Sequence, residues 1–287
     1  MNNDSNVAVV VDSAISLPKD LVVENRLFVV PLELVFEGRT YRDGLDMDAA
    51  EFYKRLLLAH RLPTTSAPTP QAFLEAFRQA SRASNRILCL TISAKFSATY
   101  NSARVAAETA AKEMPGTQIV LVDTGTAAAS QALVSLEVAR SAMKGESLSQ
   151  LQTRASDVCS RVRFVAFLDT LYYLWKGGRV PKVGMWVTSM LKIKPMFELV
   201  KDDVHMIERP RTRQKATERL LDVMKSKVAD GKVHAIVVHA HCKEEAEHVR
   251  EKIIASFECS EVLVSEFSPV LGAHTGPGLI GIAFWSE

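Results

Sequence analysis

The sequence predicts an α/β protein in which strands and helices alternate and the N-terminal sheet is parallel. Short apolar runs of strand length alternate with longer segments of helical spacing, an order typical of parallel sheets covered by helices on both faces. Several of these runs show no polar alternation, as expected for strands buried on both sides. The 287 residues are 47% hydrophobic and 24% charged, an ordinary globular balance.

The first half of the chain establishes this alternation. Residues 7–12 form an apolar run that ends in Asp12-Ser13 and predicts a buried strand, and residues 27–36 predict a second strand. Residues 49–60 have the spacing of an amphipathic helix. The pattern continues with a loop at 63–70, a helix at 71–81, a strand at 87–92, a hydroxyl-rich segment at 93–101 leading into a helix to about 112, a strand at 119–123 and a helix at 127–144.

The second half restarts after a helix at 148–161. Gly145 ends one predicted helix and Ser147 caps the next. We place a domain boundary near residue 162, which divides the chain into an N-terminal domain, 1–161, and a C-terminal domain, 162–287. The second part predicts a strand at 162–168, helices at 170–176 and 182–191, a hairpin of 193–200 and 204–209, a helix at 212–229, a strand at 235–239, a helix at 243–257, and strands at 262–267 and 280–285.

Charge and composition exclude several classes of protein. The net charge is +2, and without a dense basic run this balance predicts no nucleic-acid role. Residues 1–6 lack the features of a secretory signal, and no apolar stretch is long enough for a transmembrane segment. The cysteines have no C-x-x-C spacing and are expected to be reduced thiols of a cytoplasmic protein; they are Cys89, Cys159, Cys242 and Cys259.

Residues 64–69, Thr-Thr-Ser-Ala-Pro-Thr, are the first candidate for binding chemistry. Hydroxyls beside free backbone N–H groups, just before a helix, can bind an anion. The alternative is purely structural, with Thr69 capping the helix and Pro70 at its first position.

A second hydroxyl-rich segment, residues 91–102, follows a predicted buried strand and opens a helix. In open α/β sheets, ligands bind at this end of the strands. Ser97 or Thr99 could cap the helix, but the segment holds more hydroxyls than one cap requires. Ligand binding and helix capping both remain possible roles for this segment.

Two glycine-rich segments carry the remaining candidates. His274 lies among glycines and a proline in residues 272–278, where it could donate to an anion or belong to a tight turn. Arg179 follows Gly177-Gly178, where it could reach a phosphate or carboxylate or follow a simple helix C-cap.

An enzyme is the alternative to a binding protein. Asp12, His274 and Arg179 could serve a small-molecule phosphoryl- or acyl-transfer reaction. The sequence lacks a G-x-x-x-x-G-K-S/T loop, a G-x-G-x-x-G turn, a G-x-S-x-G elbow and an H-E-x-x-H pair. No metal site is predicted, because strand alternation separates Cys242 from His239 and His241.

Taken together and in order, these segments resemble the DegV family over nearly the whole chain. The matching pieces are Val11-Asp12-Ser13 with Leu17-Pro18; Val30-Pro31-Leu32 with Gly38 and Tyr41-Arg42-Asp43; Thr65-Ser66-Ala67-Pro68; Ser97 to Ala103; Val122-Asp123-Thr124; Leu171 to Arg179; Ile193-Lys194-Pro195; and His274 to Gly278.

The resemblance implies a two-domain DegV-like fold, with an N-terminal, Rossmann-like parallel-sheet domain and a C-terminal α/β domain. It also implies a long-chain fatty acid such as palmitate, held in a buried tunnel in the N-terminal domain. The positions that match the family's carboxylate ligands are Thr65 and Ser97. The supporting positions at the head group or partner site are Ser66, Ser93, His274, Thr275 and Arg179.

The resemblance further implies a carrier, not an enzyme, that needs no cofactor. A partner fatty-acid kinase would hold the nucleotide and phosphorylate the presented carboxylate. The sequence departs from the family pattern at Ala98, where glycine is usual, and at Ala67, where glutamine is usual. Ala98 is expected to tighten the backbone near the head group, and Ala67 to remove a polar contact.

Overall fold

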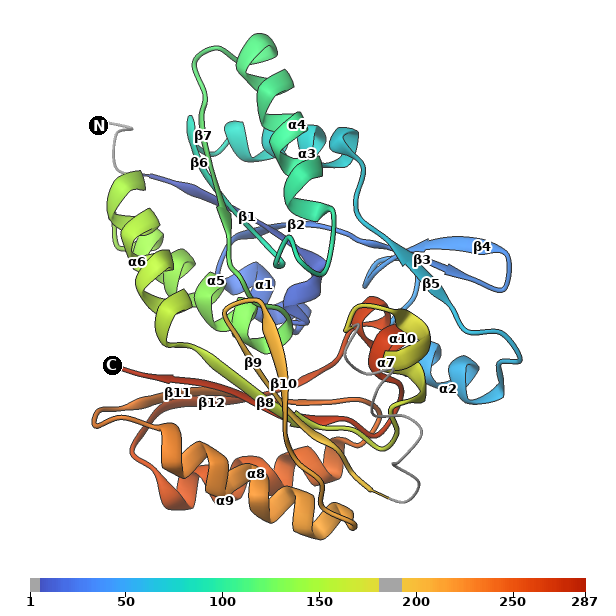
Figure 1. Cartoon of the computed structure of the whole chain (residues 1–287). Helices are drawn as coiled ribbons and strands as arrows, with labels where there is room; N and C mark the ends of the chain where they lie inside the picture. Colours follow the sequence, from blue (N-terminus) through green and yellow to red (C-terminus); the bar gives the residue numbers. More distant parts are fainter. Residues whose placement is uncertain (1–5, 181–192) are drawn as a thin grey trace.

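The computed structural model describes residues 6–180 and 193–287 and contains alternating layers of helices and sheets (Figure 1). The first sheet has four strands, all parallel, in the order β2-β1-β6-β7. Helices α3 and α4 pack on one face, and α5 and α6 on the other. The predicted parallel sheet with helices on both faces is confirmed. The elements are β1 (Ala8–Asp12), β2 (Leu27–Val30), β6 (Arg86–Thr91), β7 (Gln118–Asp123), α3 (Pro70–Ser81), α4 (Thr99–Glu113), α5 (Ala128–Met143) and α6 (Leu148–Arg161).

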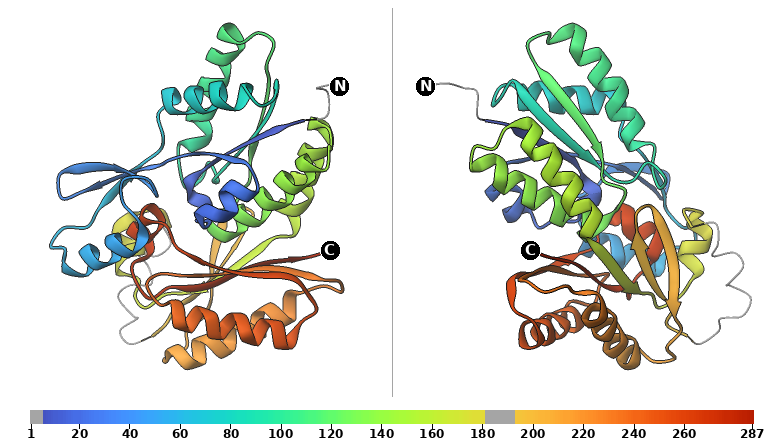
Figure 2. Two further views of the ribbon diagram at one scale, coloured as in Figure 1. Left: turned by 180° about the vertical axis from the view of Figure 1, so that it is seen from behind. Right: turned by 60° about the vertical axis from the view of Figure 1, so that its left-hand side comes forward.

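The second sheet has six strands in the order β10-β9-β8-β13-β11-β12. It is mixed, because β11 and β12 are parallel while the other neighbours are antiparallel. Helices α8 and α9 cover its outer face, and α5 and α6 contact its inner face (Figure 2). The elements are β8 (Arg163–Phe167), β9 (Met196–Val200), β10 (Asp203–Glu208), β11 (Val233–His239), β12 (Cys259–Glu266), β13 (Ile280–Ser286), α8 (Arg213–Lys227) and α9 (Lys243–Ser256).

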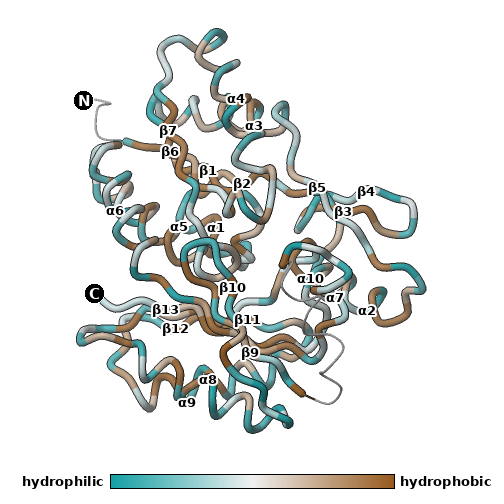
Figure 3. The backbone as a smooth tube through the Cα atoms, viewed as in Figure 1, coloured by the Kyte–Doolittle hydropathy of each residue, from teal (hydrophilic) through white to brown (hydrophobic). Residues whose placement is uncertain are grey.

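Helix α5 therefore lies between the two sheets. Its residues are buried over most of its circumference, which explains its alanine-rich, apolar sequence. Figure 3 shows apolar residues concentrated in the strands of both sheets. One apolar core joins the first sheet, α5 and the second sheet. The division into two domains, 1–161 and 162–287, stays a prediction.

The single strand predicted at 27–36 is wrong. It divides at Pro31, which lacks the N–H group that a central strand requires. The chain then enters a small antiparallel sheet of order β4-β3-β5. The loop predicted at 63–70 is also corrected, because its centre is a strand paired with β3. The small sheet consists of β3 (Glu33–Phe36), β4 (Arg39–Arg42) and β5 (Thr64–Ser66).

Helical elements beside this small sheet complete the fold. The predicted helices at 49–60 and 170–176 are confirmed as α2 (Ala49–Leu58) and α7 (Tyr172–Gly177). The tight turn considered for 272–278 is shorter than that range, because α10 (Pro269–Thr275) includes its first residues and only Pro277 and Gly278 form a turn. Neither helix α1 (Lys19–Glu24) nor the 3-10 turn η2 (Ser13–Ile15) was predicted from the sequence. The helix predicted at 182–191 lies outside the described residues.

Candidate functional site

An apolar cavity lies where α5, the second sheet, α10 and the small sheet meet. Its apolar walls come from both halves of the chain, and its volume is about 170 Å³. The alternate residues Phe164 and Ala166 of β8 face it, as do Phe197 and Leu199 of β9. The resemblance places the tunnel in the N-terminal domain, whereas much of this cavity's wall belongs to the second sheet.

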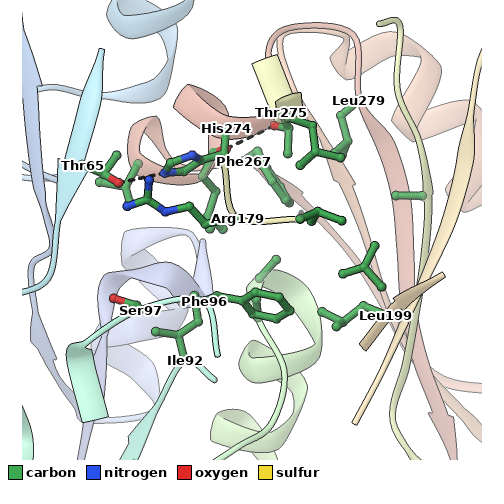
Figure 4. Close-up of a pocket in the computed structure, with 18 of the residues that line it drawn as sticks. Thr65, Ile92, Phe96, Ser97, Arg179, Leu199, Phe267, His274, Thr275 and Leu279 are labelled. Carbon is green, nitrogen blue, oxygen red and sulfur yellow. Dashed lines mark hydrogen bonds between the residues drawn. The ribbon is translucent and has the colours of Figure 1, made fainter. Parts of the chain in front are cut away.

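Polar side chains enter this cavity from β5, the segment after α7, α10 and the loop before α4. In Figure 4, Thr65, Ser97 and Arg179 lie on one side of the cavity, and Leu199 lies on the opposite side. All the predicted site residues except Ser93 line the cavity, namely Thr65, Ser66, Ser97, Arg179, His274 and Thr275.

Thr65 reaches the cavity because of its register in β5. It pairs with the fully buried Leu34 of β3, and the two side chains share one face. Its strand neighbours Thr64 and Ser66 are exposed; Ser66 also borders the cavity, but its hydroxyl donates to Glu33 Oε2 at 2.9 Å. Strand alternation thus selects Thr65 among the three hydroxyl residues of β5.

His274, in the last turn of α10, contacts Thr65 directly. Its Nε2 lies 2.8 Å from Thr65 Oγ1. Its Nδ1 is buried and has no hydrogen-bond partner among the described residues. Burial, and secondarily the charge of Arg179, lowers the pKa of His274 to about 4, so the imidazole is neutral at pH 7. With the proton on Nε2, His274 donates to Thr65 and leaves the threonine hydroxyl proton free for a ligand.

The close approach of α7 to His274 depends on Gly177. A Cβ atom at this position would lie 2.4 Å from His274 Nδ1. Gly177 also accepts a 2.8 Å hydrogen bond from Arg179 Nη1 through its carbonyl. The Gly-Gly-Arg segment therefore brings an exposed guanidinium to the His274 side of the cavity (Figure 4). Thr275 is already engaged, because its hydroxyl donates to Leu271 O within α10.

Ser97 lies just before α4, after β6. Its Oγ accepts a 3.3 Å bond from Thr99 N and lies 2.7 Å from Thr99 Oγ1. If Thr99 donates in the second contact, the Ser97 hydroxyl proton is free to bind an anion. Phe96, beside it, lines the cavity, whereas Phe73 and Phe77 belong to α3 and pack in the core against the first sheet.

Ala98, which was expected to tighten the backbone near the head group, adopts an unstrained conformation. It is the N-cap residue of α4, with φ −73° and ψ 7°, a conformation open to any residue.

We therefore expect Ala98→Gly to change the free energy of unfolding by less than about 1 kcal/mol, because both residues fit this backbone. Thermal denaturation measures the effect. A larger loss of stability would show that the methyl group itself is needed.

Two predicted residues lie outside the cavity. The buried Ser93 donates its hydroxyl to Asp202 and accepts from Lys95 N at 3.1 Å. Asp12 is buried at the end of β1, where it accepts from Ala14 N, Ile92 N and Gln131 Nε2. Burial raises the pKa of Asp12 to about 6. The predicted catalytic group of Asp12, His274 and Arg179 is therefore not brought together, since Asp12 does not line the cavity.

Across 6–180 and 193–287, no group of three or more His, Cys, Asp or Glu side chains is placed to hold a metal ion. His239 is buried, and this burial lowers its pKa to about 4. In the same two ranges, none of the helices combines the length and apolar character needed to cross a membrane.

Sequence reasoning missed the residues that form the far wall of the cavity. Phe164, Ala166 and Leu168 alternate along the predicted strand at 162–168, so their common face was readable. The sequence did not show what that face would cover, because α5, the layer opposite it, is a separate segment of the chain.

Comparison with known proteins identifies relatives along the whole chain. Residues 6–287 match the family model described as "Uncharacterised protein, DegV family". A DegV domain-containing protein of Halalkalibacterium halodurans is 30% identical over 99% of each chain. Protein DegV of Bacillus subtilis is 27% identical over 97% of this chain and 99% of its own.

Solved structures agree with this assignment. The structure named "Fatty Acid Binding of a DegV family Protein from Thermus thermophilus" has a TM-score of 0.91 and 28% identity, covering 98% of this chain and 100% of that one. A stearic acid-binding protein from Eubacterium ventriosum has a TM-score of 0.90 and 26% identity, covering 98% of each chain. The sequence match, the two-sheet fold and the shared segments give one result: the chain belongs to the DegV family.

Proposed function

We propose that this protein binds one long-chain fatty acid, such as palmitate, in the cavity between α5 and the second sheet. The observation that carries the proposal is an apolar cavity with Thr65, Ser97 and Arg179 on one side and aliphatic and aromatic side chains elsewhere. The names of two related structures, which state fatty-acid binding and stearic acid binding, support the same ligand class.

The energetics fit an amphiphilic acid. Each methylene transferred from water to the apolar wall contributes about 0.8 kcal/mol, so a long tail supplies most of the affinity. The carboxylate loses water on entry and needs charge-assisted hydrogen bonds in return. In our proposal, Thr65 and Ser97 donate them, while His274 orients Thr65 and Arg179 adds positive charge.

The position of the head group suggests how the ligand is used. Arg179 is exposed, so a carboxylate beside it stays within reach of a docked partner. The chain lacks the phosphate-binding loops of a nucleotide enzyme. We infer that it is a cytoplasmic carrier without a cofactor, and that a partner fatty-acid kinase phosphorylates the presented acid.

Mass spectrometry of the denatured protein tests this proposal. We expect a fatty acid to co-purify with the protein, or to be retained after exposure to a mixture of fatty acids and removal of excess lipid. Finding no acyl chain in either sample would refute fatty-acid binding.

Binding should also be linked to the protonation of His274. A carboxylate placed beside the imidazole favours its charged form, so binding raises the His274 pKa from about 4. Below pH 7 the wild type should take up protons on binding, and its affinity should increase as the pH falls toward 5.5. Titration calorimetry in buffers of different ionisation enthalpy counts these protons.

His274→Gln is the control, because glutamine can donate to Thr65 but does not titrate. If this variant and the wild type took up equal numbers of protons on binding, His274 would not be the group that binds the proton.

A further inference from the structure

The hairpin of β9 and β10 forms one end of the second sheet and part of the cavity wall. β10 is the last strand of its sheet, so it is held by β9 alone in the ladder. Phe197 and Leu199 of β9, and Val204 of β10, line the cavity. Outward movement of this edge hairpin would therefore open the cavity.

The tip of the hairpin has a demanding backbone. Lys201 and Asp202 form its two-residue turn, with φ values of 44° and 66°. Turns with two left-handed residues favour Asn-Gly, because other side chains crowd the backbone there. The pair Lys-Asp is therefore unfavourable in this turn. Contacts outside the hairpin must explain why an aspartate occupies the second position.

Those contacts come from the first sheet. Asp202 N donates to Gly125 O at 2.8 Å, and Asp202 Oδ1 accepts the hydroxyl hydrogen bond of Ser93. Gly125 follows β7 and Ser93 follows β6, both at the carboxyl edge of the parallel sheet. The Asp202 carboxylate lies 3.4 Å from where a Cβ of Gly125 would be, so the loop closely fits it.

The loops after β6 and β7, which contact Asp202, are themselves held by hydrogen bonds. Ser93 is fully buried, and its amide donates to Thr126 O at 2.9 Å. The Asp123 side chain accepts from Gly125 N at 3.0 Å, which holds the loop after β7 in place. Figure 2 shows the hairpin extending from the second sheet toward the first.

We propose that Asp202 is a positioning residue that latches the β9–β10 hairpin to Ser93 and Gly125, and that this latch sets the rate at which fatty acid enters and leaves the cavity. The exchange part of this inference rests on the proposed function. The latch itself does not, because it predicts the mobility of the hairpin without ligand.

Three variants separate the latch from general stability. Asp202→Gly removes the carboxylate but suits the left-handed backbone, so the hairpin itself should not be weakened. Asp202→Asn tolerates the same backbone and keeps a neutral acceptor for Ser93, so its effect should be smaller than that of Asp202→Gly. Ser93→Ala removes the donor, and combining it with Asp202→Gly should add little to either change alone.

The first measurement is hydrogen exchange of ligand-free protein, followed by mass spectrometry of peptides covering residues 196–208. A hydrogen bond to a charged group is lost in Asp202→Gly, so these amides should exchange roughly tenfold faster than in the wild type. Unchanged exchange would overturn the latch, whatever the protein does with lipid.

The second measurement is stopped-flow release of cis-parinaric acid, a fluorescent fatty acid, into excess phosphatidylcholine vesicles. Asp202→Gly should release it roughly tenfold faster, with a smaller change in equilibrium affinity because entry accelerates too. Faster hydrogen exchange with unchanged release would overturn the control of ligand exchange. If the wild type binds no fatty acid at equilibrium, the proposed function fails, and hydrogen exchange still decides the latch.

Discussion

Replacing both Thr65 and Ser97 with alanine is expected to weaken fatty-acid binding about a hundredfold while the fold persists. Each hydroxyl donates to a carboxylate, and a hydrogen bond to a charged group contributes roughly 1.5–3 kcal/mol, or about tenfold or more in affinity. Neither side chain is fully buried, so the protein should lose little stability. Equilibrium titration with cis-parinaric acid measures the affinity, and thermal denaturation reports on the fold.

Ser66→Ala is the matched control for this double variant. Ser66 follows Thr65 in β5, but its hydroxyl bonds to Glu33 on the exposed face. Its removal should alter affinity by no more than about twofold, as for an exposed hydrogen bond. If the double variant bound as tightly as the control, the carboxylate ligands would have to be elsewhere.

Filling the cavity with Ala166→Phe is expected to reduce binding of a sixteen-carbon acid by up to about a hundredfold and of an eight-carbon acid much less. Ala166 is a small side chain of the cavity wall on β8, opposite Phe197 in the ladder. Displacing three or four methylenes from the wall costs about 3 kcal/mol at 0.8 kcal/mol each. A short tail leaves room for the new ring.

The comparison of chain lengths is made by titration with unlabelled acids that compete with cis-parinaric acid. Ala94→Phe, in the exposed loop after β6, introduces the same ring outside the cavity and should leave both affinities unchanged. Equal losses for the long and short acids would indicate damage to the head-group site or to the fold. They would argue against a tail lying along β8.

Local sequence predicted most of the first sheet because its central strands, β1 and β6, are buried on both faces. The runs at 7–12, 87–92 and 119–123 have little polar alternation, and helices of regular spacing follow the last two. Prediction failed around Pro31, where one apolar run serves two sheets. Proline shows where a ladder must break, but not which new partner the chain will take.

The candidate site, like the fold, could be predicted only in part from the sequence. The spacing of Thr65 beside a helix start and of Ser97 after a buried strand was visible in the sequence, as was the glycine pair before Arg179. Ser93 looked equivalent to Ser97 by composition, yet its hydroxyl binds Asp202, a residue 109 positions away. A hydroxyl-rich loop identifies donors, and only packing determines which of them face a ligand.

The sequence by itself determined the parallel sheet, the loop that carries Ser97, and the small residues that let α7 approach His274. These follow from side-chain periodicity and from local backbone chemistry. The tertiary structure alone decided that β8 and β9 supply the cavity wall and that Asp202 bonds the β9–β10 hairpin to the first sheet. Alternation along a strand shows which side chains share a face, but the layer opposite that face is set by contacts between distant segments.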